Sequence, residues 1–570
     1  MIKTIINHKE KVGVKTIVMS IVVFTSVIMS SCSEDILNKQ PLADISDGDI
    51  FNDDALLDAY VLGNYRAFRF FQFGAFFPEV GTDNAMHVAG GGGLQLYARN
   101  QHTADNSEDF TQNAWRENYS NIRRANIYFD RIANTMASPD LVQKLTAEMR
   151  FIRAWCYFDL ISFYGDIPLI TDLVDLGAAF DRTRTPYDEV SAFIVSELDA
   201  AIPDLPTEAF DGNTGRATRG AAMALKSRVL LYAASALHNP TNDLTKWQAA
   251  SDAAEAAMDL PEYSIDPDYS NIYNEVRSQE VMFARGYTNE NRAANTDLPG
   301  VWTWNFVIDR YYLPANYFVS DPRFTMAIQN LVDAYETQDG SPVDPQDPWT
   351  NRDPRLDMTI IHHNSVINKE GSPITIEYHY DQADPSNAAL AGLGSNLNGG
   401  TVTHYNIIKQ TDTSKPLGLE NPDHHAPWVY FRKAEMYLNY AEAQIELGNE
   451  ANARMAINKV RSRTNVDMPD VTDSGVALKQ RYRNERRVEF AFENLRWYDI
   501  TRWKIGDQVI KPAIGLTILR DNTTNPPTET YQYDRVVDEF RTWDDRMYYM
   551  PIPRAELEAS PSLLPQNPGY

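Results

Sequence analysis

The hydrophobic positions in the first third of the chain recur at helical spacing. From Leu141 onward they follow one another at steps of three and four residues, which places their side chains on one face of a helix. The stripe consists of Leu145, Met149, Ile152, Cys156 and Leu160. Gly165 follows Tyr164, and Pro168 lies just beyond, so we expect this helix to end at Tyr164.

The same spacing returns in two later parts of the chain and predicts helix pairs. One stripe comprises Ala221, Leu225, Val229, Tyr232 and Ala236, and another comprises Ala434, Leu438, Ala441 and Ile445. Gly448 ends the second stripe, and a further helix face follows directly with Ala453, Ile457 and Val460. Residues 428–464 are therefore predicted to form a helix hairpin. Helix pairs are also expected over residues 115–162 and 187–236, with one more helix over residues 247–260.

Alanines occupy the positions at which the two helices of this hairpin must approach each other. Stacked two-helix units of roughly 34 residues are typical of tetratricopeptide-like scaffolds. The full repeat consensus is matched poorly, so we predict repeat-like helix pairs and not a regular array. Between the pairs, residues 302–318 and 371–427 have no sustained helical period. Long irregular segments are usually functional or disordered, and the aromatic residues here argue against disorder.

The N-terminus has another pattern, in which a basic stretch precedes an apolar one. Four lysines come before residues 17–29, which are uncharged and too short for the ~20 residues that span a bilayer. This order is typical of a secretory signal peptide, so residues 1–31 are expected to be removed. Ser30, Ser31 and Cys32 follow, and together they resemble a bacterial lipobox in which Cys32 receives the lipid. A plain signal peptide is the alternative.

The acidic residues after Cys32 bear on the location of the mature protein. Ser33, Glu34 and Asp35 resemble the surface-export signal of some Gram-negative lipoproteins, and a solvated acidic tether is the alternative. Several acyl chains on one cysteine give a durable anchor, because each buried CH₂ contributes roughly 0.8 kcal/mol. We therefore expect a lipid-anchored outer-membrane protein that faces the cell exterior.

Charge and cysteine content narrow the possible functions. The whole chain carries a net charge of −26, and residues 1–31 contain four Lys and one Glu, so the mature chain would carry −29. Such a chain offers no excess of basic residues for nucleic acid, and it would not adhere to an anionic bilayer by charge. Of the two cysteines, Cys32 is expected to be acylated, which leaves Cys156 as a small buried hydrophobic residue.

Five segments, in order along the chain, resemble the SusD/RagB family of outer-membrane nutrient-binding lipoproteins. They are AEMRFIRAWCYFDLISFYGDIPLI (147–170), NRDPRLDMTI (351–360), FRKAEMYLNYAEAQIELG with INKVRSR (431–463), RNERRVEFAFENLRWYDITRW (483–503) and YYMPIPRAELEASPSLLPQNPGY (548–570). The resemblance implies a mostly α-helical body, in which tetratricopeptide-like helix pairs form the scaffold. Long irregular loops and minor β structure would form the ligand face. Residues 32–48 would be the lipidated tether and residues 49–570 a single body, with an N-terminal part at about 49–237 and a C-terminal part at about 277–570.

Members of this family act as lids on a TonB-dependent outer-membrane barrel of the SusC type and capture glycans, or in some cases peptides, without chemistry on the ligand. The resemblance therefore implies a glycan-binding partner of such a transporter that performs no catalysis. The sequence assigns no catalytic residue, cofactor or metal ligand, and it leaves open whether a bound ion assists. The alternatives are a peptide-binding member of the same family, a secreted glycoside hydrolase and a periplasmic tetratricopeptide scaffold. The sequence alone singles out no pair of carboxylates for hydrolysis.

Aromatic rings are the first candidates for contact with a glycan, because they stack on the apolar faces of sugars. Trp302, Trp304, Tyr311 and Tyr312 are the predicted ligand-binding rings, and packing of their loop onto the scaffold is the alternative role. A second loop, where the family places binding residues after its first helix, contains Asp83, Asn84 and His87. These three side chains are predicted to bind sugar hydroxyl groups, and a turn or helix cap is the alternative for Asp83.

Three other groups of polar residues are given structural roles. In the Arg- and Glu-rich segment from residue 483, Arg486–Glu489 and Glu493–Arg496 have i,i+3 spacing, which favours an ion-pair network on a helix. The pairs His362-His363 and His424-His425 lack a metal-binding motif and are expected to be solvated loop histidines. The acidic stretch from residue 44 to residue 58 lacks the calcium-loop spacing and predicts a capped helix start.

Overall fold

The architecture is that of a computed structural model of the 570-residue chain. It describes residues 47–68, 78–87, 94–106, 113–174, 181–211, 215–274, 278–286, 325–369, 371–383, 402–417 and 426–570. Two compact units are present: unit 1 comprises Met1–Leu57 with Thr135–Ala137, and unit 2 comprises Asp58–Asn134 with Ser138–Tyr570. Within the described ranges, no helix has the length and apolar content needed to cross a membrane.

The described part of unit 1 contains the predicted capped helix start. Helix α3 (Asp47–Asn52) is followed by α4 (Asp54–Asn64), whose first turn belongs to this unit. The Asp53 carboxylate accepts hydrogen bonds of 2.9 Å from the backbone N–H groups of Ala55 and Leu56. Since these N–H groups have no partner inside the helix, the carboxylate completes its first turn.

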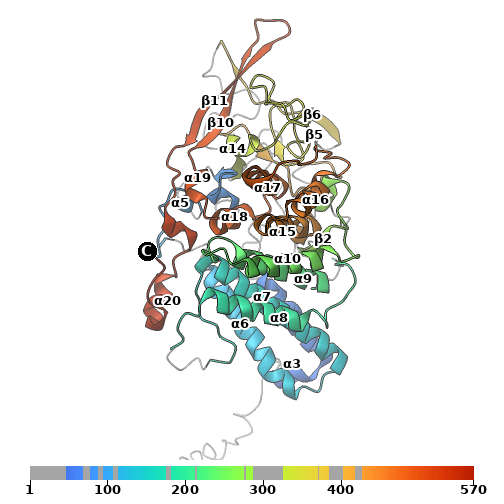
Figure 1. Ribbon diagram of the computed structural model, residues 1–570, viewed down its shortest axis with the longest axis vertical. Coiled ribbons are helices and arrows are strands. Elements are labelled where there is room, and N and C mark those ends of the chain that lie inside the picture. The colour runs from blue at the N-terminus through green and yellow to red at the C-terminus, as the bar shows by residue number, and fades with distance from the viewer. Residues whose placement is uncertain are drawn as a thin grey trace, which may run out of the picture. The chain divides into compact units, whose positions relative to one another are not determined.

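Unit 2 is built on helices that pack against one another in chain order. They are α6 (Asn113–Arg131), α7 (Pro139–Tyr164), α8 (Tyr187–Ala201), α9 (Arg219–Ala234), α10 (Leu244–Met258), α15 (Lys433–Glu446) and α16 (Glu450–Arg461). Each packs on the next, and α10 packs on α15, so that the two halves of the chain continue one stack (Figure 1). The predicted mostly α-helical fold and its helix pairs are confirmed.

Helix α7 is the longest helix of this stack, and it follows the predicted stripe. Leu145, Met149 and Leu160 are fully buried, and Cys156 is buried with them as expected. The helix ends at Tyr164 as predicted, and Gly165 caps it with φ +71°. A Cβ atom at this position would lie 2.8 Å from the ring of Tyr549, so both the backbone conformation and the close packing require glycine.

The predicted start of the helix hairpin at residue 428 is wrong. Trp428–Arg432 forms strand β9, which pairs antiparallel with β2 (Val281–Arg285), and α15 begins only at Lys433. The sequence WVYFR is aromatic and β-branched, and all five residues are buried. A short apolar run of this kind is compatible with either a strand or a buried helix turn, and pairing with β2 decides for the strand.

The Arg- and Glu-rich segment forms α17 (Gly475–Glu489) and, after a turn, α18 (Arg496–Arg502). Its ion-pair network is confirmed, but the expected i,i+3 pairing is wrong. Arg486 pairs with Asp499 at 2.8 Å, and Arg496 pairs with Asp83 at 2.8 Å. Glu489 instead binds three arginines from distant segments, Arg432 at 2.6 Å, Arg463 at 2.8 Å and Arg355 at 2.9 Å.

These ion pairs bring motifs that are distant in the sequence together in the fold. Arg355 belongs to the segment NRDPRLDMTI, Arg432 to FRKAEMYLNY and Arg463 to INKVRSR, and each meets the carboxylate of Glu489. Glu280 completes the cluster, because it accepts from both Arg432 and Arg463. All these side chains are buried, so the motif residues form the charged centre of unit 2.

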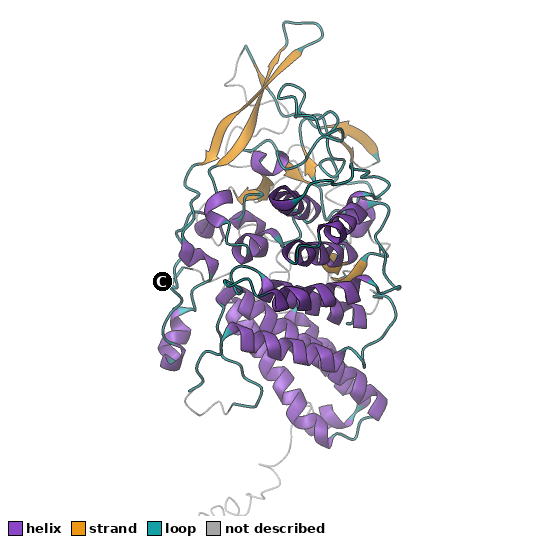
Figure 2. Cartoon of the chain, viewed as in Figure 1, coloured by secondary structure: helices purple, strands orange, loops and turns teal. Residues whose placement is uncertain are grey.

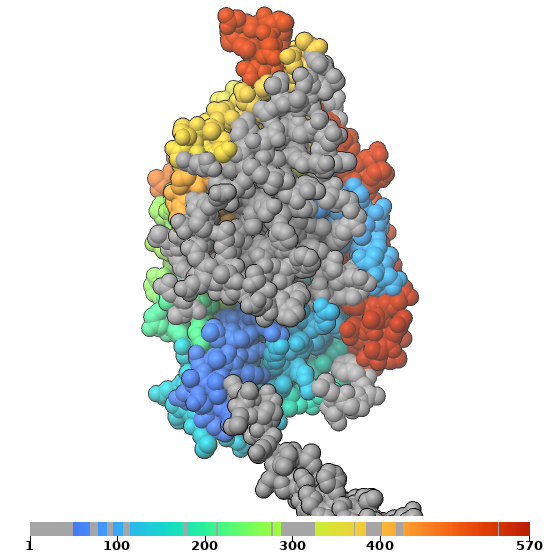
Figure 3. Space-filling model, turned by 180° about the vertical axis from the view of Figure 1, so that it is seen from behind, coloured from blue at the N-terminus to red at the C-terminus, as the bar shows by residue number. Residues whose placement is uncertain are grey.

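The strands of unit 2 make small sheets. The pairs are β1 (Ala85–His87) with β3 (Thr325–Ala327), β4 (Ile360–Ile361) with β8 (Asn406–Ile407), and β5 (Val366–Lys369) with β6 (Ser372–Thr375). The longest strands, β10 (Ala513–Asp521) and β11 (Thr528–Asp538), form an antiparallel hairpin to which β7 (Tyr380–Asp381) adds in parallel. Figure 2 shows this hairpin beyond the helices, and its tip stands out in the opposite view of Figure 3.

Short elements connect the rest of unit 2. They are η1 (Tyr65–Ala67), η3 (Pro78–Gly81), α5 (Leu94–Ala98), η5 (Ile132–Asn134), η6 (Tyr269–Tyr273), α14 (Gln329–Val332), α19 (Gly506–Val509), η7 (Asp545–Tyr548), α20 (Arg554–Ala559) and η8 (Pro561–Leu563). Of these, η3 leads into the predicted polar loop, and α20 lies beside α6 and the C-terminal end of the chain (Figure 1).

Candidate functional site

The predicted ligand-binding residues fall into two sets. Trp302, Trp304, Tyr311 and Tyr312 lie outside the described residues, as do Cys32 and the pair His424-His425. Asp83, Asn84 and His87 are described, and they lie between η3 and the end of β1. All three side chains are buried, with exposed fractions of 5%, 0% and 3%.

Two arginines hold Asp83 and Asn84 from within the protein. Arg496 donates one hydrogen bond of 2.8 Å to each carboxylate oxygen of Asp83, which is the bidentate geometry of a strong ion pair. Arg487 donates to the Asn84 side-chain oxygen at 2.8 Å. Burial alone would raise the pKa of Asp83, but the charges of Arg487 and Arg496 outweigh it and lower the pKa to about 2. These contacts engage the side chains of Asp83 and Asn84 with arginines of unit 2. Contact of Asp83, Asn84 and His87 with a sugar stays a prediction.

A second cluster of polar and aromatic side chains lies at the hairpin end of unit 2. The expectation that His362 and His363 are solvated is wrong, because their exposed fractions are 4% and 0%. Both follow directly on β4 and lie between the hairpin and the segment that ends at β7. The adjacent pair is informative because its two rings point to different partners.

The neighbours of His363 fix the tautomer of its neutral ring. The Tyr378 backbone N–H donates to Nδ1 at 2.9 Å, so Nε2 must carry the proton of the neutral ring. Nε2 then donates to the Glu529 carboxylate, which lies at 3.1 Å by both oxygens. The hydrogen bond from His363 is the main cause that lowers the pKa of Glu529 to about 2.

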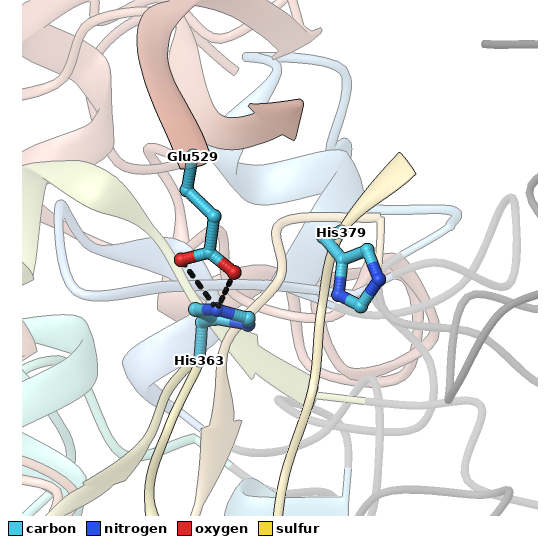
Figure 4. Close-up of side chains that lie close together, drawn as sticks. All are labelled: His363, His379 and Glu529. Atoms are coloured by element: carbon cyan, nitrogen blue, oxygen red, sulfur yellow. Dashed lines mark hydrogen bonds and ion pairs between the residues drawn. The ribbon is translucent and has the colours of Figure 1, made fainter. Parts of the chain in front are cut away.

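His379 joins this pair and makes a set of three possible metal ligands. One ligand atom from each of His363, His379 and Glu529 lies within 4.8 Å of the others (Figure 4). The Nδ1 atom of His379 has no hydrogen-bond partner among the described residues. A ligating histidine ordinarily keeps its proton on the nitrogen that faces away from the metal, whereas His363 carries it on the nitrogen that faces Glu529. The geometry therefore favours a hydrogen-bonded pair of His363 and Glu529, with the His379 ring edge-on to His363, over a metal centre.

His362 forms an aromatic platform with Trp349. The two rings stack with centroids 4.0 Å apart and planes 10° apart. Nδ1 of His362 lies 2.7 Å from the His363 carbonyl oxygen, and Nε2 lies 2.6 Å from the carboxylate of exposed Asp357. Each ring nitrogen of His362 therefore faces an oxygen acceptor, which fixes the ring over the indole of Trp349.

Further aromatic rings surround this platform. Tyr531 on β11 and Tyr405 each present an edge to Trp349, with centroids 6.3 Å apart. Gln346 pairs its side-chain amide with the backbone of Tyr531, which ties the Trp349 segment to the edge of the hairpin. Trp349 remains half-exposed. The hairpin end thus offers a partly open indole among hydrogen-bonding groups.

Sequence patterns did not single out Trp349, and they drew attention to His362 and His363 only as an adjacent pair. Trp349 lies two residues before Asn351, the first residue of NRDPRLDMTI, and this proximity is the one signal available. The adjacency of His362 and His363 was a second signal, but it was assigned to solvent because no metal motif accompanies it. The contacts of Trp349 and His363 with β11 depend on segments far apart in the sequence coming together, which no local pattern encodes.

The fold belongs to a recognisable class. Stacked helix pairs form the body, and small sheets with a long hairpin lie at one end of it. Two family models match the chain, "SusD family" over residues 268–570 and "Starch-binding associating with outer membrane" over residues 37–231. The first match alone covers more than half of the chain. This protein belongs to the SusD family.

Relatives and solved structures agree with this assignment. A SusD-like protein P25 of Formosa agariphila is 23% identical over 97% of this chain and 99% of its own. A SusD-like protein of Bacteroides ovatus is 24% identical over 85% of this chain and 82% of its own. The crystal structure of a SusD-like protein from Bacteroides fragilis superposes with a TM-score of 0.75 at 27% identity, covering 93% of this chain and all of that one. A laminarin-binding SusD-like protein shares the fold with a TM-score of 0.61 at 21% identity, covering 91% of this chain and all of that one.

Proposed function

We propose that this protein is a cell-surface lipoprotein that binds oligosaccharide and delivers it to a SusC-like TonB-dependent transporter in the outer membrane. Membership in the SusD family is the observation that carries the proposal, because the matched models and relatives together span the chain. One of those models is described as starch-binding, and one structural neighbour is described as laminarin-binding. The protein captures its ligand without chemical conversion.

The ligand is held by aromatic rings and hydrogen-bonding side chains. Trp302, Trp304, Tyr311 and Tyr312 supply rings from the sequence segment that precedes β3, and Trp349 adds a half-exposed indole at the hairpin end. A sugar ring stacks its apolar face on such indoles while its hydroxyl groups bind polar neighbours. The lipid on Cys32 holds the protein at the outer membrane, where the acidic chain does not adhere by charge.

Isothermal titration tests the ligand class directly. The soluble chain that lacks residues 1–32 is titrated with malto-oligosaccharides, laminari-oligosaccharides and a mixture of short peptides. Binding of an oligosaccharide with no change in its length on chromatography supports the proposal. Binding of peptides alone assigns the peptide-binding role, and release of reducing sugar assigns a hydrolase. Trp302→Ala with Trp304→Ala is expected to weaken glycan affinity at least tenfold, whereas Trp247→Phe, a buried scaffold indole, is expected to leave it unchanged.

The anchor and the partner are tested in cells. Cys32→Ala is expected to release the protein from the outer-membrane fraction, and protease added to intact cells is expected to digest the wild type. Affinity purification of tagged wild type from detergent-solubilised membranes is expected to recover a TonB-dependent barrel protein. A mature chain without lipid, shown by mass spectrometry, would overturn the anchor.

A further inference from the structure

A cavity of about 380 Å³ lies far from the hairpin end, between α6, residues 166–174 and the C-terminal segment that contains α20 and η8. Its volume is within the range of small-ligand sites. The helices α6 and α20 border it at the opposite end of unit 2 from β10 and β11 (Figure 1). Residues on its wall that carry chemistry are Trp115, Arg116, Tyr119, Arg123, Asp172 and Glu556.

The wall of this cavity is fixed by hydrogen bonds between α6 and the segment that crosses it. The Tyr119 hydroxyl donates to the Pro168 carbonyl at 2.9 Å, and Arg123 donates to the Val174 carbonyl at 2.8 Å. Asn126 donates to the Ile170 carbonyl at 2.9 Å. These bonds secure the segment along three successive turns of α6, so the cavity is preformed and a ligand need not order it.

The cavity combines an aromatic floor with a charged rim. The rings of Trp115 and Tyr119 lie with centroids 5.0 Å apart, and Tyr164 supports Trp115 from the edge. Glu556 on α20 faces them. Burial raises the pKa of Glu556, while a hydrogen bond from Trp115 and the charge of Arg116 oppose this rise. Arg116 itself is exposed. An aromatic surface is therefore flanked by a carboxylate that accepts and a guanidinium that donates.

This combination fits a pyranose. A sugar ring has an apolar C–H face for the aromatic floor, and neighbouring hydroxyl groups that both donate to a carboxylate and accept from a guanidinium. We propose that the cavity is a second glycan-binding site, which takes one pyranose residue or the end of a neutral oligosaccharide. The proposal rests on the proposed function, since it assigns a second position to the same class of ligand.

Fluorine NMR locates binding at this cavity. The soluble chain is labelled with 5-fluorotryptophan, and the Trp115 resonance is assigned as the one missing from Trp115→Phe. Maltohexaose and laminarihexaose are the probes. The expected result is that one of them shifts the Trp115 resonance, and that Glu556→Gln and Arg116→Ala each raise the concentration needed by about tenfold. Arg554→Ala is the control, because this exposed residue of α20 pairs with Asp105 outside the cavity.

The outcomes separate the two proposals. If a hexasaccharide releases heat in titration and shifts other tryptophan resonances while Trp115 stays unchanged, the second site is wrong and the proposed function stands. A Trp115 shift that Glu556→Gln and Arg116→Ala leave at the wild-type concentration also overturns the site. If neither sugar gives heat nor any shift, glycan binding by this chain fails for these sugars, and the second site fails with it.

Discussion

Helices α7 and α17 are both central to unit 2, but they are buried by different means. Of the residues that α7 buries, most are apolar, and Leu145, Ile152 and Leu160 have no exposed surface. Half of the residues that α17 buries are charged, among them Glu485 and Glu489. An apolar helix tolerates many neighbours of suitable shape, whereas a charged one requires a partner for each charge. Burial in α17 therefore depends on residues supplied by other segments.

This difference affects which substitutions each helix tolerates as much as it affects stability. A buried ion pair gains little net free energy over apolar side chains of the same volume, yet removal of one partner leaves a charge without compensation. Glu489 has three arginines as partners, so its removal leaves more than one buried cation with less compensating charge. The comparison predicts that α17 is the more sensitive helix to single substitutions.

The largest effect is expected for Glu489→Ala. Arg355, Arg432 and Arg463 would remain buried with less compensation, and the free energy of unfolding should fall by about 3–5 kcal/mol. Urea unfolding followed by circular dichroism measures it. Lys226→Ala is the matched control, because its single partner in this ion pair, Asp199, is exposed, and the substitution should cost at most about 1 kcal/mol. A loss below about 1 kcal/mol for Glu489→Ala would contradict the comparison.

A smaller effect is expected for Leu160→Ala in α7. This substitution removes a fully buried side chain and leaves a cavity, which costs about 2–5 kcal/mol. The informative test compares two substitutions that conserve side-chain shape, one in each helix. Leu160→Met should cost less than about 1.5 kcal/mol, whereas Glu489→Gln keeps the shape but loses the charge and should remain strongly destabilising. Equal losses for these two variants in urea would show that the helices do not differ in kind.

The smallest effect, and the one most dependent on pH, concerns Glu79. This fully buried carboxyl accepts from the neutral Asn84 amide at 2.8 Å, and burial raises its pKa to about 7. The unfolded chain ionises Glu79 above its usual pKa of 4.5, so this group lowers stability progressively as the pH rises from about 4.5 to 7. Glu79→Gln should remove that loss. Thermal melts are expected to show the variant gaining about 1–3 kcal/mol on the wild type between pH 4.5 and pH 8.

Asp83 provides the control of opposite sign for that experiment. Its pKa is depressed to about 2, so the stability it contributes is present above pH 4 and is lost as the pH falls towards 2. Asp83→Asn should therefore be destabilising at pH 7 and progressively less so in acid. If the stability difference between Glu79→Gln and wild type stayed constant from pH 4.5 to pH 8, the raised pKa of Glu79 would be contradicted.

Sequence periodicity predicted α7, α9, α15 and α16 because each has an apolar stripe that local spacing reveals. It failed at β9, since four apolar residues followed by Arg432 do not distinguish a strand from a helix turn until β2 is in place. It also failed for the partners of Arg486 and Arg496. Spacing of i,i+3 on a helix is visible in sequence, but a bond from Arg496 to Asp83 joins positions 413 residues apart.

The candidate site was less predictable than the fold for the same reason. Aromatic residues can be counted in a sequence, but which rings face solvent depends on the segments that cover them. Trp349 is half-buried because His362 covers one side of its ring and the hairpin edge meets it from another. The predicted rings at 302–312 lie outside the described residues, and their role stays a prediction.

The bond between Asp83 and Arg496 also has a consequence for biogenesis. The ribosome makes the chain from its N-terminus, so Asp83 is synthesised long before its counter-ion Arg496. Closing a loop of 413 residues carries an entropic cost that grows only slowly with length, but the bond cannot form until most of the chain has been made. A product truncated before Arg496 would therefore hold the Asp83 carboxylate without this partner.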